Sequence, residues 1–181
     1  MLTTPSQTLG PFFAYGLTAR QYNYDYSSVL ENSLINDSIE GERINIIGQI
    51  FDGEGNRIND AMVELVQKFE INGQMITKMA RQGTGPDAEN RFRFITIKPT
   101  GNEGDAPHID VIVMMRGSLR HLYTRLYFSD ETDNSNDNLL NSITADRRNS
   151  MIANKFVKNN QVFYEFNIKM QGEEETIFFD L

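Results

Sequence analysis

The 181-residue chain contains no cysteine, no tryptophan and only two histidines, His108 and His121. Without thiols it has no disulfide, no thiolate metal site and no cysteine nucleophile. No lysine/arginine run exceeds two residues and the formal net charge is −8, so a surface for nucleic acid or an anionic membrane is not expected. Residues 1–7 lack the segments of a signal peptide, and no apolar run approaches the ~20 residues of a membrane span. We therefore expect a soluble cytoplasmic protein.

Several common catalytic motifs are also missing. There is no P-loop, no G-x-G-x-x-G after a predicted strand and no serine in a nucleophile elbow. Carboxylates are abundant, but runs such as residues 173–175 are typical of solvated faces. These patterns argue against a nucleotide-binding enzyme and against a serine hydrolase.

Short segments with strand-like composition, bounded by turn residues, dominate what is present. They predict strands at residues 44–51, 61–71, 74–79, 91–97, 108–116, 120–128, 162–170 and 176–179. Asn72-Gly73 predicts a tight hairpin, because both residue types tolerate positive φ. An apolar content of 39% is enough for one core, so residues 1–181 are expected to form a single domain, with 1–43 as an irregular extension. The fold class is all-β, a β-sandwich with long loops.

One or two short helices are expected beside the strands. Thr144 is a candidate N-cap for a helix over 145–156, where Ile152 and Phe156 stand one turn apart. The acidic, asparagine-rich segment 130–141 is expected to be an exposed loop.

His108 and Asp110 are the candidate chemical pair. Alternation along a strand places both side chains on one face. Two histidines and a carboxylate can hold non-haem iron, which here would require His121 from the neighbouring strand. The alternative is that His108 is a buried histidine with a satisfied hydrogen bond, and the residues alone leave both interpretations open.

Four segments, taken together, resemble the intradiol ring-cleavage dioxygenases, and specifically the alpha type of their two-chain members. The segments are Thr-Pro-Ser-Gln-Thr-Leu-Gly-Pro at 4–11, Gly-Gln-Ile-Phe-Asp-Gly at 48–53, Pro-His-Ile-Asp at 107–110 running to Leu-Tyr-Phe at 126–128, and 171–180. The resemblance implies a β-sandwich and cleavage of protocatechuate with O2 to 3-carboxy-cis,cis-muconate. It also implies a beta chain that pairs with this one in a larger hetero-oligomer and binds Fe(III) through two tyrosinates and two histidines.

The same resemblance implies a degenerate metal site in this chain. His108 and Asp110 match the two histidine positions, and Phe92 matches a tyrosine position. No tyrosine occurs between Tyr26 and Tyr123, and phenylalanine cannot coordinate. We therefore expect no catalytic residue and no metal in this chain alone.

A contribution to the partner's substrate pocket is implied instead. Thr8, Gly10 and Pro11 match an N-terminal segment that reaches the partner's site, and Arg116 matches an arginine that faces the substrate. Without the resemblance, Arg116 is an ordinary arginine at a strand end. Met75 stands where the family often has a tyrosine near the site.

Two questions remain open at this level. The chain could be an autonomous metalloenzyme that uses His108, Asp110 and His121, or a stand-alone β-sandwich that acts as a binding or scaffold module. The aromatic residues within 12–26 and 163–179 are expected to pack either on this chain or on the partner.

Overall fold

The computed structural model describes residues 10, 13–36 and 39–180. Its helical elements are α1 (Phe13–Leu17), η1 (Ala19–Tyr22), η2 (Thr132–Asn136), α2 (Asn138–Ser142) and η3 (Arg148–Met151). Its strands are β1 (Arg43–Phe51), β2 (Met62–Ile71), β3 (Gln74–Gly83), β4 (Arg91–Ile97), β5 (His108–Met114), β6 (Leu122–Phe128), β7 (Ile152–Lys158), β8 (Gln161–Glu165) and β9 (Ile168–Lys169).

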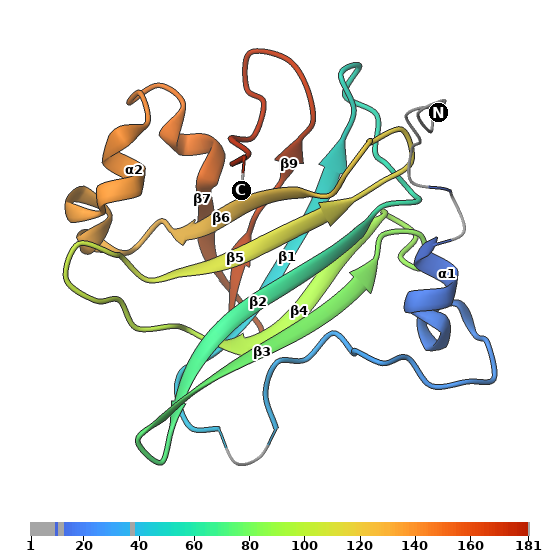
Figure 1. Cartoon of the computed structure of the whole chain (residues 1–181), viewed down its shortest axis with the longest axis horizontal. Helices are drawn as coiled ribbons and strands as arrows, with labels where there is room; N and C mark the ends of the chain where they lie inside the picture. The colour runs from blue at the N-terminus through green and yellow to red at the C-terminus, as the bar shows by residue number, and fades with distance from the viewer. Residues whose placement is uncertain (1–9, 11–12, 37–38, 181) are drawn as a thin grey trace, which may run out of the picture.

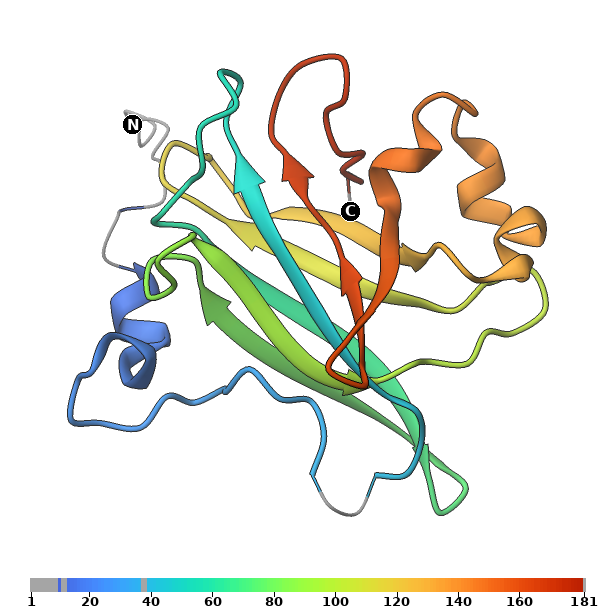
Figure 2. The same ribbon diagram turned by 180° about the vertical axis from the view of Figure 1, so that it is seen from behind.

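The strands pair in the order β3-β2-β5-β6-β7-β8-β1-β4, and β9 pairs with β1. Strands β3, β2, β5 and β6 form one layer, with β1, β4 and β9 behind it (Figures 1 and 2). Strand β7 links the two layers, because Ile152 and Ala153 pair with β6 while the rest of the strand pairs with β8. The predicted all-β sandwich with one or two short helices is confirmed, with two short α-helices among the described residues.

The core lies between the layers and follows from strand alternation. Phe92 and Phe94 of β4 and Ile44 and Ile46 of β1 are fully buried, as every second residue of each strand turns inward. Gly48 of β1 packs so tightly that a Cβ there would collide with the Phe166 carbonyl and the Phe92 ring. The Gly-Gln-Ile-Phe-Asp-Gly segment therefore begins with glycine for a steric reason.

The helix predicted over 145–156 is wrong. Residues 148–151 form the 3-10 turn η3, and β7 follows at once. Phe156 pairs with Phe163 across β7 and β8, and their rings stack at 5.1 Å between centroids. This cross-strand pairing outweighs the helical spacing of Ile152 and Phe156, because strand propensity depends on packing partners.

The exposed loop predicted over 130–141 is also corrected. It contains η2 and α2, and the fully buried Asp137 caps α2 by accepting a hydrogen bond from the Leu140 N–H at 2.6 Å. Leu140 packs with Tyr127 and Met151 in a small second core over the outer face of β6. The last predicted strand, 176–179, is reduced to a single bridge between Tyr123 and Phe179.

None of the helices in the described part of the chain is long and apolar enough to cross a membrane.

Candidate functional site

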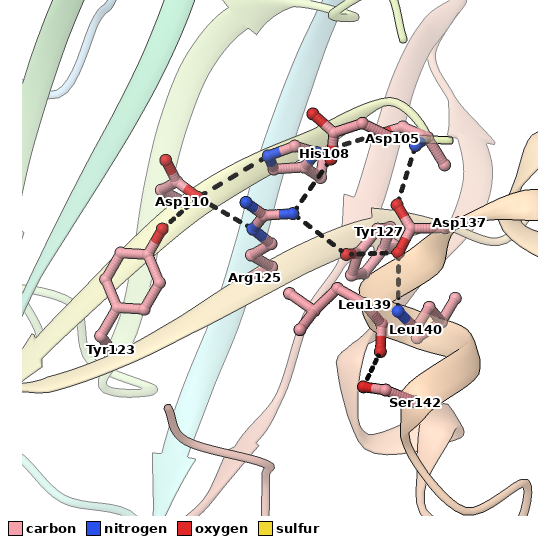
Figure 3. Close-up of polar contacts among 11 residues, drawn as sticks. Asp105, His108, Asp110, Tyr123, Arg125, Tyr127, Asp137, Leu139, Leu140 and Ser142 are labelled. Atoms are coloured by element: carbon pink, nitrogen blue, oxygen red, sulfur yellow. Dashed lines mark hydrogen bonds and ion pairs between the residues drawn. The ribbon is translucent and has the colours of Figure 1, made fainter. Parts of the chain in front are cut away.

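The site grows from the β5–β6 hairpin. The register places His108 opposite Tyr127 and Asp110 opposite Arg125. Side chains of paired residues emerge on the same face of a sheet. These four groups therefore converge on one face of the layer formed by β3, β2, β5 and β6 (Figure 3).

The His108 ring is held by the backbone that leads into β5. Its Nδ1 lies 2.8 Å from the Ala106 carbonyl oxygen, which can only accept, so Nδ1 carries the proton. Its Nε2 then faces Asp110 at 3.7 Å from Oδ1. The ring is 16% exposed. This geometry fits the histidine with a satisfied hydrogen bond that the sequence left as one interpretation.

Arg125 supplies a cation beside that pair. Its Nη1 donates to Asp105 Oδ1 at 3.1 Å, and its Nε lies 3.4 Å from Asp110 Oδ1, at ion-pair distance but without hydrogen-bond geometry. The guanidinium is 22% exposed and sits between two carboxylates. It therefore neutralises the negative charge of these carboxylates, which would otherwise attract a metal ion.

Two tyrosines also reach this cluster, from β6. Tyr123 donates to Asp110 Oδ1 at 2.5 Å, and Tyr127 donates to Asp137 Oδ1 at 3.1 Å. Burial, with the hydrogen bond to Asp110 next in size, raises the pKa of Tyr123 to about 12. Burial also raises the pKa of Tyr127. Both shifts disfavour the phenolate, which is the form that coordinates iron.

Sequence reasoning missed Tyr123, Arg125 and Tyr127, because the search for tyrosines covered only the segment before the hairpin. The signal was present as alternation along one strand, where these three residues share the face of His108 and Asp110. Asp105, four residues N-terminal to Ile109, carried no such periodic signal.

The residues around His108 do not fit the iron site that the family resemblance implies for the partner chain. No group of three or more histidine or acidic side chains within the described ranges is placed to hold a metal ion. The cluster combines one histidine, a guanidinium and phenols with raised pKa values. Its chemistry is that of a charge-paired surface cluster.

A cavity of about 200 Å³ opens beside His108 and Asp110. Met75 of β3 lines it, together with Lys68 and Glu70 of β2. Phe92 does not line it, since that ring is buried between the layers. The structure thus brings Met75, and not Phe92, to the His108 cluster.

His121 lies at the other end of the hairpin. Leu122 pairs with Val113, whereas His108 pairs with Tyr127. Six residues of strand separate His121 from Tyr127, which corresponds to roughly 20 Å. The metal site of His108, Asp110 and His121 is therefore not assembled, and that alternative is wrong.

Arg116, one of the residues expected in the partner's pocket, belongs to this opposite end. Arg116 follows β5 and places its Nε 3.0 Å from Asp60 Oδ2. Gly10 is exposed, while Thr8 and Pro11 lie outside the described residues. Helix α1 and the β5–β6 turn lie on the same side of the molecule (Figures 1 and 2).

Comparison with solved structures defines the class. The chain is similar to an intradiol ring-cleavage dioxygenase from Tetranychus urticae, with a TM-score of 0.63 and 14% identity over 81% of this chain and 88% of that one. It is also similar to the dioxygenase domain of a carbohydrate-binding fusion protein from Streptomyces sp. SirexAA-E, with a TM-score of 0.61 and 22% identity over 92% and 96%. The fold is that of the intradiol ring-cleavage dioxygenases.

Comparison with curated sequences narrows the class. No protein-family model matches. The protocatechuate 3,4-dioxygenase alpha chain of Burkholderia cepacia is 43% identical over 98% of this chain and 97% of that protein. The alpha chain of Pseudomonas putida is 34% identical over 98% and 96%, and the Burkholderia cepacia beta chain is 26% identical over 81% and 72%. The chain belongs to the family of protocatechuate 3,4-dioxygenase alpha chains.

Proposed function

We propose that this chain is the alpha subunit of a two-chain protocatechuate 3,4-dioxygenase whose iron is carried by the beta subunit. Similarity to alpha chains over 98% of the sequence supports the subunit type. The observation that carries the division of labour is Arg125, a guanidinium paired with Asp105 and Asp110 beside the His108 position. Because the Arg125 guanidinium already balances the charge of these carboxylates, a metal ion bound beside His108 would gain little electrostatic stabilisation.

The Fe(III) of the beta subunit would supply the activation of the catecholate for reaction with O2. The ring then opens between its two hydroxyl-bearing carbons, which gives 3-carboxy-cis,cis-muconate. This chain's part is to bind and orient the substrate at the mouth of the partner's site.

Arg116 and the N-terminal segment would do this work. Arg116 is 64% exposed, so its guanidinium is accessible to the carboxylate that distinguishes protocatechuate from catechol. Gly10 has no neighbour within 4 Å of the place that a Cβ would take, so its own chain leaves that side open. Thr8, Gly10 and Pro11 would form a wall of the pocket on the partner.

The N-terminal extension is the proposed surface for the beta subunit. Tyr24, Tyr26 and Val29 are 48%, 54% and 87% exposed. Apolar groups gathered on one irregular segment are typical of a partner interface. By contrast, Tyr164 and Phe166 in the C-terminal aromatic cluster are buried within this chain.

The test is the iron content and visible spectrum of this chain, purified alone and co-expressed with its beta-type partner. We expect colourless, inactive protein alone, and iron with ring cleavage in the complex. Stoichiometric metal in the lone chain would contradict the proposal. So would a beta-type chain that cleaves protocatechuate equally well without this one.

A further inference from the structure

The ion pair between Arg116 and Asp60 is asymmetric. Arg116 is 64% exposed, whereas Asp60 is only 16% exposed. Contact is made through Arg116 Nε, which lies 3.0 Å from Asp60 Oδ2 at ion-pair distance but without hydrogen-bond geometry, and among the described residues no other ion pair engages this guanidinium. Because a guanidinium has five N–H donors in one plane, the terminal amino groups are left to bind a second carboxylate.

Asp60 stands on a turn that is fixed from both sides. The buried Thr84 donates its hydroxyl to the Ile58 carbonyl at 2.8 Å and accepts from the Ala61 N–H at 3.2 Å. Its own N–H donates to the Ala61 carbonyl at 2.9 Å. The backbone on each side of Asp60 is thus anchored to one buried side chain, so Asp60 is a rigid point from which to hold a flexible arginine.

The segment that continues from residues 8–11 packs beside this turn. A Cβ on Gly85 would lie 2.7 Å from the Tyr22 hydroxyl and 2.8 Å from the Asn59 carbonyl, so Tyr22 and the turn that carries Asp60 both lie against this glycine. Burial raises the pKa of Tyr22, and the charge of Asp60 contributes to the rise. Asp60 is therefore paired with the arginine and is also close enough to Tyr22 for its charge to act on that tyrosine.

We propose that Asp60 is a positioning residue for Arg116: it holds Nε so that the two terminal amino groups meet the ring carboxylate of the substrate end-on. This inference rests on the proposed function, in which Arg116 faces the partner's substrate site. The ligand class is a planar carboxylate on an aromatic ring, which such an arginine binds through two parallel hydrogen bonds.

The direction in which Asp60→Ala changes carboxylate binding distinguishes a positioning role from a purely electrostatic one. Asp60 partly neutralises Arg116, so if Arg116 acted only through its charge, Asp60→Ala would strengthen carboxylate binding. If Asp60 acts by orienting the guanidinium, Asp60→Ala weakens carboxylate binding instead. Asp60→Asn keeps a side-chain oxygen that can accept a hydrogen bond from Nε, and it therefore recovers binding if orientation is what matters.

The experiment measures kcat and KM for protocatechuate in the complex of this chain with its beta-type partner. The inhibition constant of catechol as a competitor is measured in parallel, because catechol lacks the carboxylate. The variants are Asp60→Ala, Asp60→Asn, Arg116→Ala and the double variant Asp60→Ala/Arg116→Ala. Asp180→Ala is the matched control, since Asp180 pairs with Arg120 of the same turn at 2.6 Å but is 79% exposed.

For Asp60→Ala we expect KM for protocatechuate to rise roughly 3- to 10-fold, with kcat and the catechol constant unchanged. Arg116→Ala should raise KM at least as much, and the double variant should match Arg116→Ala, since both changes remove one interaction. Asp60→Asn and Asp180→Ala should stay near the wild type.

Other outcomes overturn the inference in distinguishable ways. A lower or unchanged KM in Asp60→Ala, an equal loss for catechol, or additivity in the double variant would each remove Asp60 from this role. An effect of Asp60→Ala without an effect of Arg116→Ala would do the same. Absence of ring cleavage by the wild-type complex would instead reject the proposed function, and this role with it.

Discussion

At the scale of single residues, Arg125 determines the charge balance of the cluster around His108. One guanidinium contacts Asp105 and Asp110, and His108 Nδ1 is bonded to the Ala106 carbonyl, so three groups that could attract a metal ion are already paired. Tyr123 adds a hydrogen bond to the same Asp110 oxygen. The hairpin therefore holds a charge network at His108 and Asp110, the positions that the family resemblance matches to metal ligands.

Removing that guanidinium should be costly. Arg125→Met leaves Asp105 and Asp110 without their cation, and we expect the free energy of unfolding to fall by about 1–3 kcal/mol, less than for a fully buried pair because Arg125 is 22% exposed. Urea unfolding of the lone chain measures the change. Arg120→Met, which breaks an exposed pair, is the control and should cost under about 0.5 kcal/mol. Equal small losses in both variants would show that Arg125 is not needed for charge balance.

At the scale of elements, Asp130 ties four strands together. It follows β6 and accepts hydrogen bonds from Lys98 after β4, Lys155 of β7 and Tyr164 of β8. Burial by itself would raise the pKa of Asp130, but the hydrogen bonds from Lys155, Tyr164 and Lys98 outweigh it and lower the pKa to about 2. The carboxylate is thus stabilised in its charged form at the junction of the two layers.

The lowered pKa makes part of the stability depend on pH. A depressed folded-state pKa contributes stability that is complete above the unfolded value near 4 and is lost as pH falls from about 4 to about 2. With Asp130 31% exposed, solvent screening limits the contribution to on the order of 1–2 kcal/mol. Unfolding of the wild type and Asp130→Asn should therefore differ at pH 7 and converge near pH 2. Asp133→Asn, a change at an exposed carboxylate of the same loop, should show no such trend.

At the scale of the whole molecule, the chain leaves a large share of its N-terminal aromatic surface uncovered. Tyr24 and Tyr26 lie 5.8 Å apart between ring centroids and are about half exposed. The cores between the layers and under α2 are by contrast closed. The extension is thus the part of the fold that a partner would complete.

Tyr24→Ser/Tyr26→Ser should weaken assembly with the beta-type chain by roughly tenfold or more, because two aromatic anchors would be lost. The lone chain should keep its melting temperature within a few degrees, because neither ring is buried. Association is measured by titrating one chain into the other. Val157→Ser on the β7–β8 hairpin, at a residue that is 65% exposed, is the surface control. Unchanged affinity in the tyrosine variant would place the interface elsewhere.

Many of the strands and turns of this molecule could be predicted from local sequence. The alternation of Phe92 and Phe94 predicted a strand, and Asn72-Gly73 predicted a hairpin, which forms with φ of 52° and 76° at the two residues. The helix predicted over 145–156 was wrong because the helical spacing of this segment competes with strand pairing. The pairing partner Phe163 lies on another strand, so the local sequence does not show it. The family resemblance rested on short segments along the whole chain, so residue types and their order were enough to carry it.

The sequence by itself determined most of the strands, the fold class, the absence of thiol chemistry and the family, because each depends on residue type, local period or motif. Only the tertiary structure decided the contacts. The register of β5 and β6 brings Arg125 to Asp110 and carries His121 away from His108, and the turn before β2 brings Asp60 to Arg116. Such pairings join residues far apart in the chain, and which of them form depends on how the layers pack rather than on any local pattern.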